Sequence, residues 1–341
     1  MNRKHVNIPV FIPHLGCPNQ CVFCNQKTIS GVSEFDIEKV KEIIESAIST
    51  IDVNNTYVEI AYFGGSFTGI EYDTMCQLLQ IAYHYVEKGL VKAIRLSTRP
   101  DYIDEKILTT LKKYQVKTIE LGLQSASDKV LLECKRGHNF KDSEKSCRLI
   151  SEYGFDLVGQ MMIGLPASTL EDELATAKFI VESGAVAARI YPTVVFKDTE
   201  LCSMSMCGEY KPIPIDDAVE RSASVFRLFI ENGVDVIRIG LCASENLASE
   251  DKYYAGPNHP ALGELVLGRY FLKVILDEVN KLSVRGDRSE VACAPKSLSR
   301  AIGQNKINKR QLCELLDLKD AIFTTDNSLG EYRVSVKTIG G

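Results

Sequence analysis

Three cysteines lie within eight residues near the start of the chain, in the segment GCPNQCVFCNQ. Cys17, Cys21 and Cys24 have the spacing C-x3-C-x2-C, and Pro18 disfavours a helix, so the thiols converge only if the segment wraps as a loop. Thiolates are the ligands of iron–sulfur clusters, and a four-iron cluster normally takes four of them. Three would leave one iron without a protein ligand, and an open coordination position is typical of a metal centre that performs chemistry.

A structural zinc site is the alternative for these cysteines. Zinc sites usually have four ligands in two Cys- or His-containing halves, and no second half follows nearby, although His14 offers a fourth ligand. The chain has 11 cysteines, an odd number, and its first residues contain no apolar signal segment. Both observations favour reduced thiols over a disulfide framework. No apolar run approaches the roughly 18 residues of a membrane span, so we expect a cytoplasmic protein without membrane contact.

The overall composition is that of a globular protein. The 341 residues include 40 Lys and Arg and 45 Asp and Glu, a formal charge of −5, with 45% hydrophobic and 25% charged residues. These values argue against a disordered or fibrous chain. At about 150 residues per domain, the length suggests roughly two domains.

The elements that must position the cysteines read as alternating helices and strands. Helices are predicted at 37–51 and 216–232 among others, and glycines stand at helix-to-strand junctions. Continuous apolar runs predict strands, as is typical of parallel sheets covered on both faces. About seven strands in 240 residues favour a partial (β/α) barrel with its chemistry at the carboxyl ends of the strands, and an open doubly wound sheet is the alternative. The predicted strands are 7–12, 57–63, 91–97, 116–123, 157–163, 186–195 and 234–241.

The sequence becomes loop-like after about residue 245. We expect a core at 1–245, a connecting helical segment at 246–285 and a small basic α+β domain at 286–341. The small domain reads as strand, helix, helix, strand and strand, at 290–294, 298–302, 307–316, 321–325 and 332–336. Residues 281–310 contain eight Lys or Arg and two Asp or Glu, a local charge of +6.

The cysteine spacing, with Phe23 just before the last cysteine, resembles the signature of the radical S-adenosylmethionine (SAM) superfamily. In that family three cysteines hold a [4Fe–4S] cluster, and SAM chelates the open iron. An electron, supplied by a donor such as ferredoxin or flavodoxin, splits SAM to a 5′-deoxyadenosyl radical that abstracts hydrogen from a substrate. The resemblance implies both cofactors and an α/β fold, a partial (β/α)6-type radical SAM barrel with a small C-terminal α+β extension.

Further motifs are similar to the radical SAM core of the Elongator catalytic subunit, over residues 12–241. They are FGGSF, LSTRPDYID, ELGLQS, CKRGHN, GQMMIGLP and RIYPTVVFKDTEL, in this order along the chain. Coproporphyrinogen-type radical SAM enzymes share the cysteine, Gln-Ser and Arg-Gly-His features more loosely. The resemblance therefore implies a radical SAM enzyme, without naming its catalytic residues.

The glycines of FGGSF are expected to let the backbone approach a ligand, against the alternative of a tight turn. Many radical SAM enzymes have Gly-Gly-Glu here to hold the methionyl amine of SAM. This chain has Gly64, Gly65 and Ser66, so the partner of that amine is open. The sequence is instead similar to the Gly-Gly-Thr version of the Elongator subunit.

Four polar side chains further along are candidates for SAM contacts. Ser97, Gln124 and Gln160 fall near the ends of successive predicted strands, where uncharged polar groups can hydrogen-bond ribose hydroxyls. Arg136 is a forked donor suited to the SAM carboxylate. Phe23 completes the predicted set of cofactor-binding residues.

The substrate is expected to be RNA, with transfer RNA as the resemblance implies. The Elongator subunit carries an acetyltransferase domain after its radical core, and the roughly 100 residues that follow the core here are too few for it, so acetyl-CoA is not expected. The phrase LSRAIGQNKINKRQL resembles the helix, loop and helix of KH RNA-binding domains, with Lys306 in place of the second loop glycine. A solvated basic helical cap is the alternative. A radical enzyme acting on a small metabolite, coproporphyrinogen oxidase-like, and a non-catalytic iron–sulfur RNA-binding protein remain open.

Overall fold

The computed structural model describes residues 4–12, 15–17, 21–25, 35–241, 252–282 and 287–339. His14, Pro18 and the predicted boundary near residue 245 lie outside these ranges. Among the described helices, none is long and apolar enough to cross a membrane.

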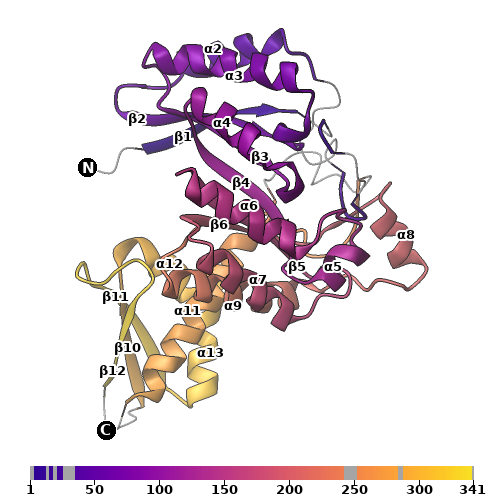
Figure 1. Cartoon of the computed structure of the whole chain (residues 1–341). Helices are drawn as coiled ribbons and strands as arrows, with labels where there is room; N and C mark the ends of the chain where they lie inside the picture. The colour runs from indigo at the N-terminus through magenta and orange to yellow at the C-terminus, as the bar shows by residue number, and fades with distance from the viewer. Residues whose placement is uncertain are drawn as a thin grey trace.

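The core is one curled sheet of seven parallel strands in the order β1-β2-β3-β4-β5-β6-β8 (Figure 1). This confirms the α/β partial barrel. The seven apolar runs became strands because both faces of a parallel sheet are covered. The strands are β1 (Lys4–Phe11), β2 (Thr56–Phe63), β3 (Ala93–Thr98), β4 (Val116–Gln124), β5 (Asp156–Ile163), β6 (Ala187–Pro192) and β8 (Asp235–Ile239).

Helices connect the strands and cover the outer, convex face of the sheet (Figure 1). Buried side chains such as Leu78, Leu108 and Ile180 pack from these helices onto the strands in one continuous hydrophobic core. The predicted helices 37–51 and 216–232 are confirmed within two residues. The helices are α2 (Lys39–Ser49), α3 (Tyr72–Glu87), α4 (Glu105–Lys113), α5 (Asp128–Glu133), α6 (Phe140–Glu152), α7 (Leu170–Glu182) and α9 (Ile215–Glu231).

The single strand predicted at 186–195 was wrong after residue 192. β6 ends at Pro192, and the Thr193 amide and hydroxyl both donate to the Ile163 carbonyl, which turns the chain out of the sheet. The chain then forms β7 (Val195–Phe196), which pairs antiparallel with β9 (Tyr253–Ala255), and continues into α8 (Glu200–Met206).

The C-terminal extension begins with α11 (Leu262–Asn280), which packs against α9. Its three-stranded sheet has the order β11-β10-β12, with β10 parallel to β11 and antiparallel to β12. Phe226 of α9 meets Tyr270 and Tyr332 edge to face, at centroid distances of 5.0 and 5.3 Å, so aromatic packing joins extension and core. The elements are β10 (Arg288–Cys293), α12 (Leu298–Ile302), α13 (Ile307–Leu316), β11 (Asp320–Thr325) and β12 (Val334–Ile339).

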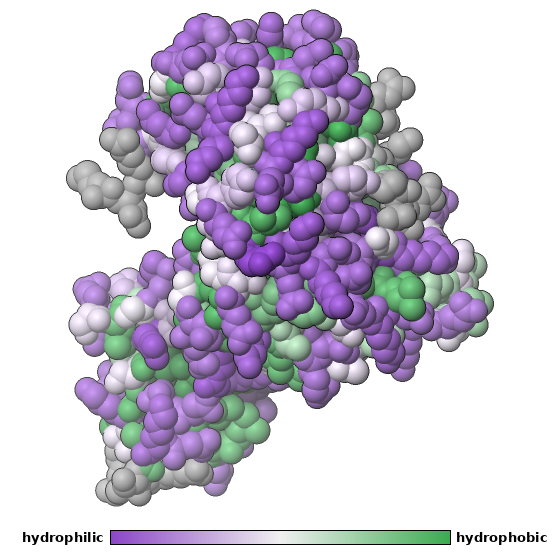
Figure 2. Space-filling view, viewed as in Figure 1, coloured by the Kyte–Doolittle hydropathy of each residue, from purple (hydrophilic) through white to green (hydrophobic). Residues whose placement is uncertain are grey.

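The surface in Figure 2 is mostly hydrophilic over α2, α3 and α4, whereas hydrophobic residues lie in small groups over the extension. Ile307, Leu315 and Ile322 are exposed there. The small α+β extension is confirmed as a structure, and its resemblance to a KH domain stays a prediction.

Candidate functional site

A cavity of about 720 Å³ lies inside the curled sheet. A cavity of this size suits a ligand of nucleotide dimensions. Most of the predicted cofactor-binding residues line it, whereas Ser66 and Arg136 do not. Gly64, Ser97 and Gln124 lie at or next to the carboxyl ends of β2, β3 and β4, whereas Gln160 lies within β5. The lining residues among the predicted set are Phe23, Cys24, Gly64, Gly65, Ser97, Gln124 and Gln160.

The cysteine segment closes one side of this cavity. The Cys24 amide donates to the Cys21 carbonyl at 2.9 Å, which forms a turn from Cys21 to Cys24. The predicted convergence of all three thiols stays a prediction. Val22 fixes it from two sides: its amide donates to the Cys134 carbonyl, and its carbonyl accepts from the Leu201 amide of α8. Among the described residues, no three His, Cys, Asp or Glu side chains are gathered closely enough to hold a metal ion.

Gly65 of FGGSF and Gly16 let the loop after β2 lie directly against the start of the cysteine segment. A β-carbon at Gly65 would lie 2.3 Å from the Leu15 carbonyl oxygen, and one at Gly16 would lie 2.2 Å from the Ser66 carbonyl oxygen. The two backbones therefore pack directly on each other, which only glycine permits. The close approach that the sequence predicted toward a ligand is here an approach to the cysteine segment itself, while both Gly64 and Gly65 also face the cavity.

Ser66 lies on the cysteine side of this loop. Burial raises the pKa of the Cys17 thiol, and the Ser66 hydroxyl and the charges of Arg99 and Arg136 act in the opposite direction. Ser66 is fully buried. Its predicted place beside the methionyl amine of SAM stays a prediction.

Arg136 contacts a cysteine. Its Nη1 donates to Cys21 Sγ at 3.3 Å and its Nη2 to the Gly122 carbonyl at 2.6 Å. Arg99 holds the Arg136 carbonyl through Nη2 at 2.5 Å and forms a two-pronged pair with Asp101 at 2.9 and 2.8 Å. The predicted contact of Arg136 with the SAM carboxylate is not tested by these distances and stays a prediction.

Gln124 has two features that are typical of ligand-binding residues. It ends β4 with a left-handed backbone, φ 66°, at a register shift of the β4–β5 pairing. Its Oε1 is buried and has no hydrogen-bond partner among the described residues. Strained backbone and an unsatisfied buried acceptor both carry a free-energy cost, and both cluster at binding sites.

The charges around the cysteines suit an anionic group such as a thiolate-bound cluster. Arg99 Nη1 and Arg136 Nε are buried donors without partners in the described part of the chain, and both guanidinium groups act on the cysteine thiols. Unsatisfied cationic donors beside thiols favour an anionic group at that place.

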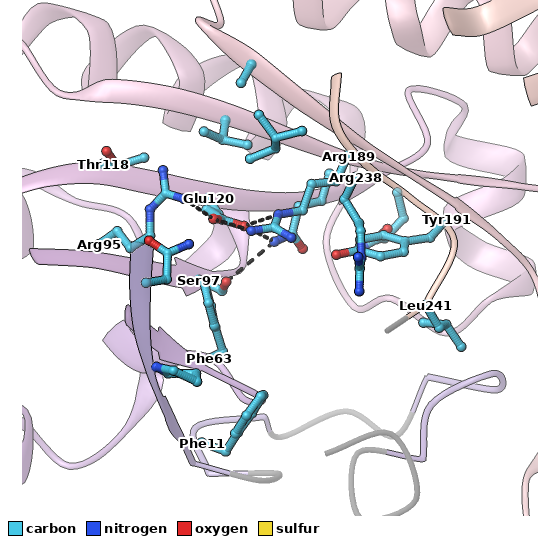
Figure 3. A pocket seen from close by; sticks show the side chains of 18 of the residues that line it. Phe11, Phe63, Arg95, Ser97, Thr118, Glu120, Arg189, Tyr191, Arg238 and Leu241 are labelled. Atoms are coloured by element: carbon cyan, nitrogen blue, oxygen red, sulfur yellow. Dashed lines mark hydrogen bonds and ion pairs between the residues drawn. The ribbon is translucent and has the colours of Figure 1, made fainter. Parts of the chain in front are cut away.

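Sequence reasoning missed a layer of charged side chains on the cavity wall, which we call the ion layer: Glu59, Arg95, Glu120 and Arg189, one from each of β2, β3, β4 and β6. Figure 3 shows Arg95, Glu120 and Arg189 of this layer. Arg95 lies 3.3 Å from both Glu59 and Glu120, and Arg189 Nε lies 2.7 Å from Glu120. Gln160 Nε2 donates to Glu120 at 2.9 Å and lies 3.4 Å from Ser97 Oγ. The ion layer therefore connects to two predicted SAM contacts.

The register of the strands explains how these charges meet. Arg95 pairs with Ala61, two residues beyond Glu59, and Glu120 pairs with Ser97, two residues beyond Arg95. Because side chains alternate in a strand, a step of two keeps each charge on the inner face. The available sequence signal for the ion layer is that its charged residues occupy inward positions of otherwise apolar strands.

Two family models match the chain. The model described as "Radical SAM superfamily" matches residues 11–180, and the "Radical_SAM C-terminal domain" matches residues 186–270. The second match extends into α11.

Individual relatives match over shorter stretches. A tRNA uridine(34) acetyltransferase from Methanocaldococcus jannaschii is 35% identical over 131 residues, which are 38% of this chain and 24% of the relative. The human Elongator complex protein 3 is 31% identical over 193 residues, 55% of this chain and 34% of the relative. The matches thus span about a quarter to a third of these relatives' own length.

A solved structure shares the fold. The archaeal Methanocaldococcus infernus Elp3 with an N-terminal deletion aligns with a TM-score of 0.62 at 22% identity, covering 80% of this chain and 68% of that one. The similarity supports the parallel, partial-barrel architecture of the core.

Proposed function

Because the chain belongs to the radical SAM superfamily, we propose that it binds a [4Fe–4S] cluster through Cys17, Cys21 and Cys24 and uses SAM to modify RNA. When bound, the cluster and SAM together supply a 5′-deoxyadenosyl radical that abstracts hydrogen from a substrate. The residues of this chain bind, orient and shield these groups. Transfer RNA is the favoured substrate.

The observation that carries the cofactor half of the proposal is the unsatisfied Gln124 Oε1 on the cavity wall, close in the fold to the cysteine segment. Ser97, Gln124 and Gln160 offer uncharged hydrogen-bonding groups for a nucleoside. Phe23 and Phe63 supply apolar surface beside them, which excludes water.

The RNA half of the proposal is supported by the relatives and by the extension. A relative that matches the core is named as a tRNA uridine(34) acetyltransferase. In the extension, Lys306 and Arg310 are exposed and line a shallow hollow of about 320 Å³ at the start of α13. Neither has an ion pair in the described residues, so both are available to phosphate groups.

Two measurements test the proposal. Reconstituted protein incubated with SAM and dithionite should release 5′-deoxyadenosine, and the yield should rise when transfer RNA is added. Mass spectrometry of RNA nucleosides from cells with and without the protein should show one modified nucleoside lost. If no 5′-deoxyadenosine forms with any RNA, protein or metabolite fraction, the proposal that the protein is an enzyme is rejected. If it forms only with a metabolite fraction, the substrate is a metabolite and not RNA.

A further inference from the structure

We propose that Arg136 raises the reduction potential of the iron–sulfur cluster by placing its positive charge on Cys21, an inference that rests on the proposed function. The proposal concerns the transfer of one electron from a low-potential donor into the cluster. No bond forms or breaks in this step, and the guanidinium stays protonated throughout.

The backbone around Arg136 is arranged to aim its side chain. Lys135 has a left-handed backbone, φ 51°, which ends the turn after α5, and the Arg136 amide donates to the Leu131 carbonyl at 3.0 Å. The Nη1 group then reaches Cys21 Sγ at 3.3 Å across 115 positions of sequence. A side chain fixed at backbone, carbonyl and guanidinium keeps its charge at one place.

The charge of Arg136 has no carboxylate partner in the described part of the chain. Arg136 is 6% exposed, and Cys21, its sulfur partner, is 8% exposed. The neighbouring Arg99 is equally buried and is paired with Asp101. A buried guanidinium without an anion costs several kcal/mol, so the anion that balances Arg136 is the thiolate of Cys21 and the cluster bound to it.

The same charge favours reduction. Reduction adds one negative charge to the cluster, and a cation held in a buried site is attracted more strongly to the reduced form than to the oxidised form. Hydrogen bonds to ligand sulfurs and the net charge nearby are known to set the potential of such clusters. Arg136 supplies both.

The test is a redox titration of the reconstituted protein without SAM, with the EPR signal of the reduced cluster measured against the solution potential. In Arg136→Met the ratio of reduced to oxidised cluster should fall about tenfold at a given potential, which equals a shift of about 59 mV for one electron. Arg136→Lys keeps the positive charge, so its reduction potential should fall by less than that of Arg136→Met. Because SAM is absent, a role in binding the SAM carboxylate cannot cause the shift.

Lys135→Met is the matched control, since it removes a neighbouring cation that is exposed and paired with Glu200. Its potential should equal that of the unmodified protein. If Arg136→Met retains no iron, Arg136→Gln decides, because it keeps an N–H donor and removes the charge. An unchanged potential in an iron-loaded Arg136→Met or Arg136→Gln protein overturns the inference alone, whereas an unmodified protein that binds no cluster overturns the proposed function.

Discussion

Arg136 at the cysteine end of the cavity and the arginines of the ion layer are in opposite electrostatic situations. In the ion layer, Arg95 and Arg189 each meet the carboxylate of Glu120, which is fully buried. At the cysteine end, Arg136 meets a thiol and a carbonyl but no carboxylate among the described residues. The fold depends on the carboxylate that balances a buried cation, because removing it leaves an uncompensated charge, whereas a buried cation without a carboxylate prepares a site for an anion.

The same distinction separates the basic residues of the C-terminal extension. Lys296 is paired with Glu331 and Lys309 with Asp320, while Lys306 and Arg310 are exposed without an ion pair in the described part of the chain. Counting cations along the sequence does not distinguish these two classes, but the fold does.

The largest expected effect contrasts two buried cysteines at the cysteine end. Cys21→Ala should abolish iron binding and the brown absorption of the reconstituted protein, because it removes a proposed ligand. Cys134→Ala should retain both, since burial raises the pKa of Cys134 to about 12 and keeps it a neutral thiol. Iron analysis and absorbance of both variants provide the measurement. Full loss of iron in Cys134→Ala would make Cys134 a ligand and contradict the three-cysteine site.

The next effect tests the ion layer. Glu120→Gln should lower the free energy of unfolding by about 3–5 kcal/mol, because it leaves Arg95 and Arg189 buried without their shared anion. Urea unfolding followed by circular dichroism measures it. The matched control is Glu152→Gln, which breaks an exposed pair with Arg148 and should cost at most about 0.5 kcal/mol. Equal costs for the two variants would mean that the ion layer does not stabilise the fold.

A smaller effect comes from His138, which lies beside Arg136. Burial and the charge of Arg136 lower the pKa of His138 to about 3. The folded state therefore stays neutral at His138 while the unfolded chain binds a proton below its ordinary pKa. The contribution of His138 to the free energy of unfolding is therefore present above about pH 6.5. It is lost as the pH falls toward 3, by up to about 1.4 kcal/mol per pH unit.

The measurement is denaturant unfolding of cluster-free protein at pH 7 and pH 5. Unmodified protein should lose about 1–2 kcal/mol more than His138→Gln over this interval. The same pH dependence in both proteins would show that His138 is accessible to protons in the folded state, and that the positive potential at the cysteine end is screened.

Most of the fold could be predicted from the sequence because buried parallel strands read as apolar runs. The helices at 298–302 and 307–316 were also predicted at their observed bounds. The cysteine segment could be found because its chemistry is local. The contact of Arg136 with Cys21 and the ion layer could not, since both join residues far apart in sequence. The ion layer also depends on the register of the sheet.

The charge of the extension is neutralised only in part, for a related reason. The local excess of +6 at 281–310 is counted within a window, but acids outside it pair with some of these cations: Glu264 and Glu331 pair with Arg300, and Asp320 with Lys309. A sequence window cannot include partners that the fold brings from elsewhere.

The smallest effect tests whether the unpaired cations of the extension contact RNA. Lys306→Ala with Arg310→Ala should weaken binding of transfer RNA several-fold and reduce the salt dependence, by about 0.9 in the logarithmic slope for each lost phosphate contact to a duplex. The control is Lys296→Ala with Lys309→Ala, which removes the same charge from residues already paired with Glu331 and Asp320. It should change binding less, because a paired cation must give up its carboxylate before it can contact phosphate. Dissociation constants measured between low and moderate KCl decide the matter: equal losses in the two double variants would show that net charge alone attracts the RNA, and that the distinction between paired and unpaired cations has no bearing on this surface.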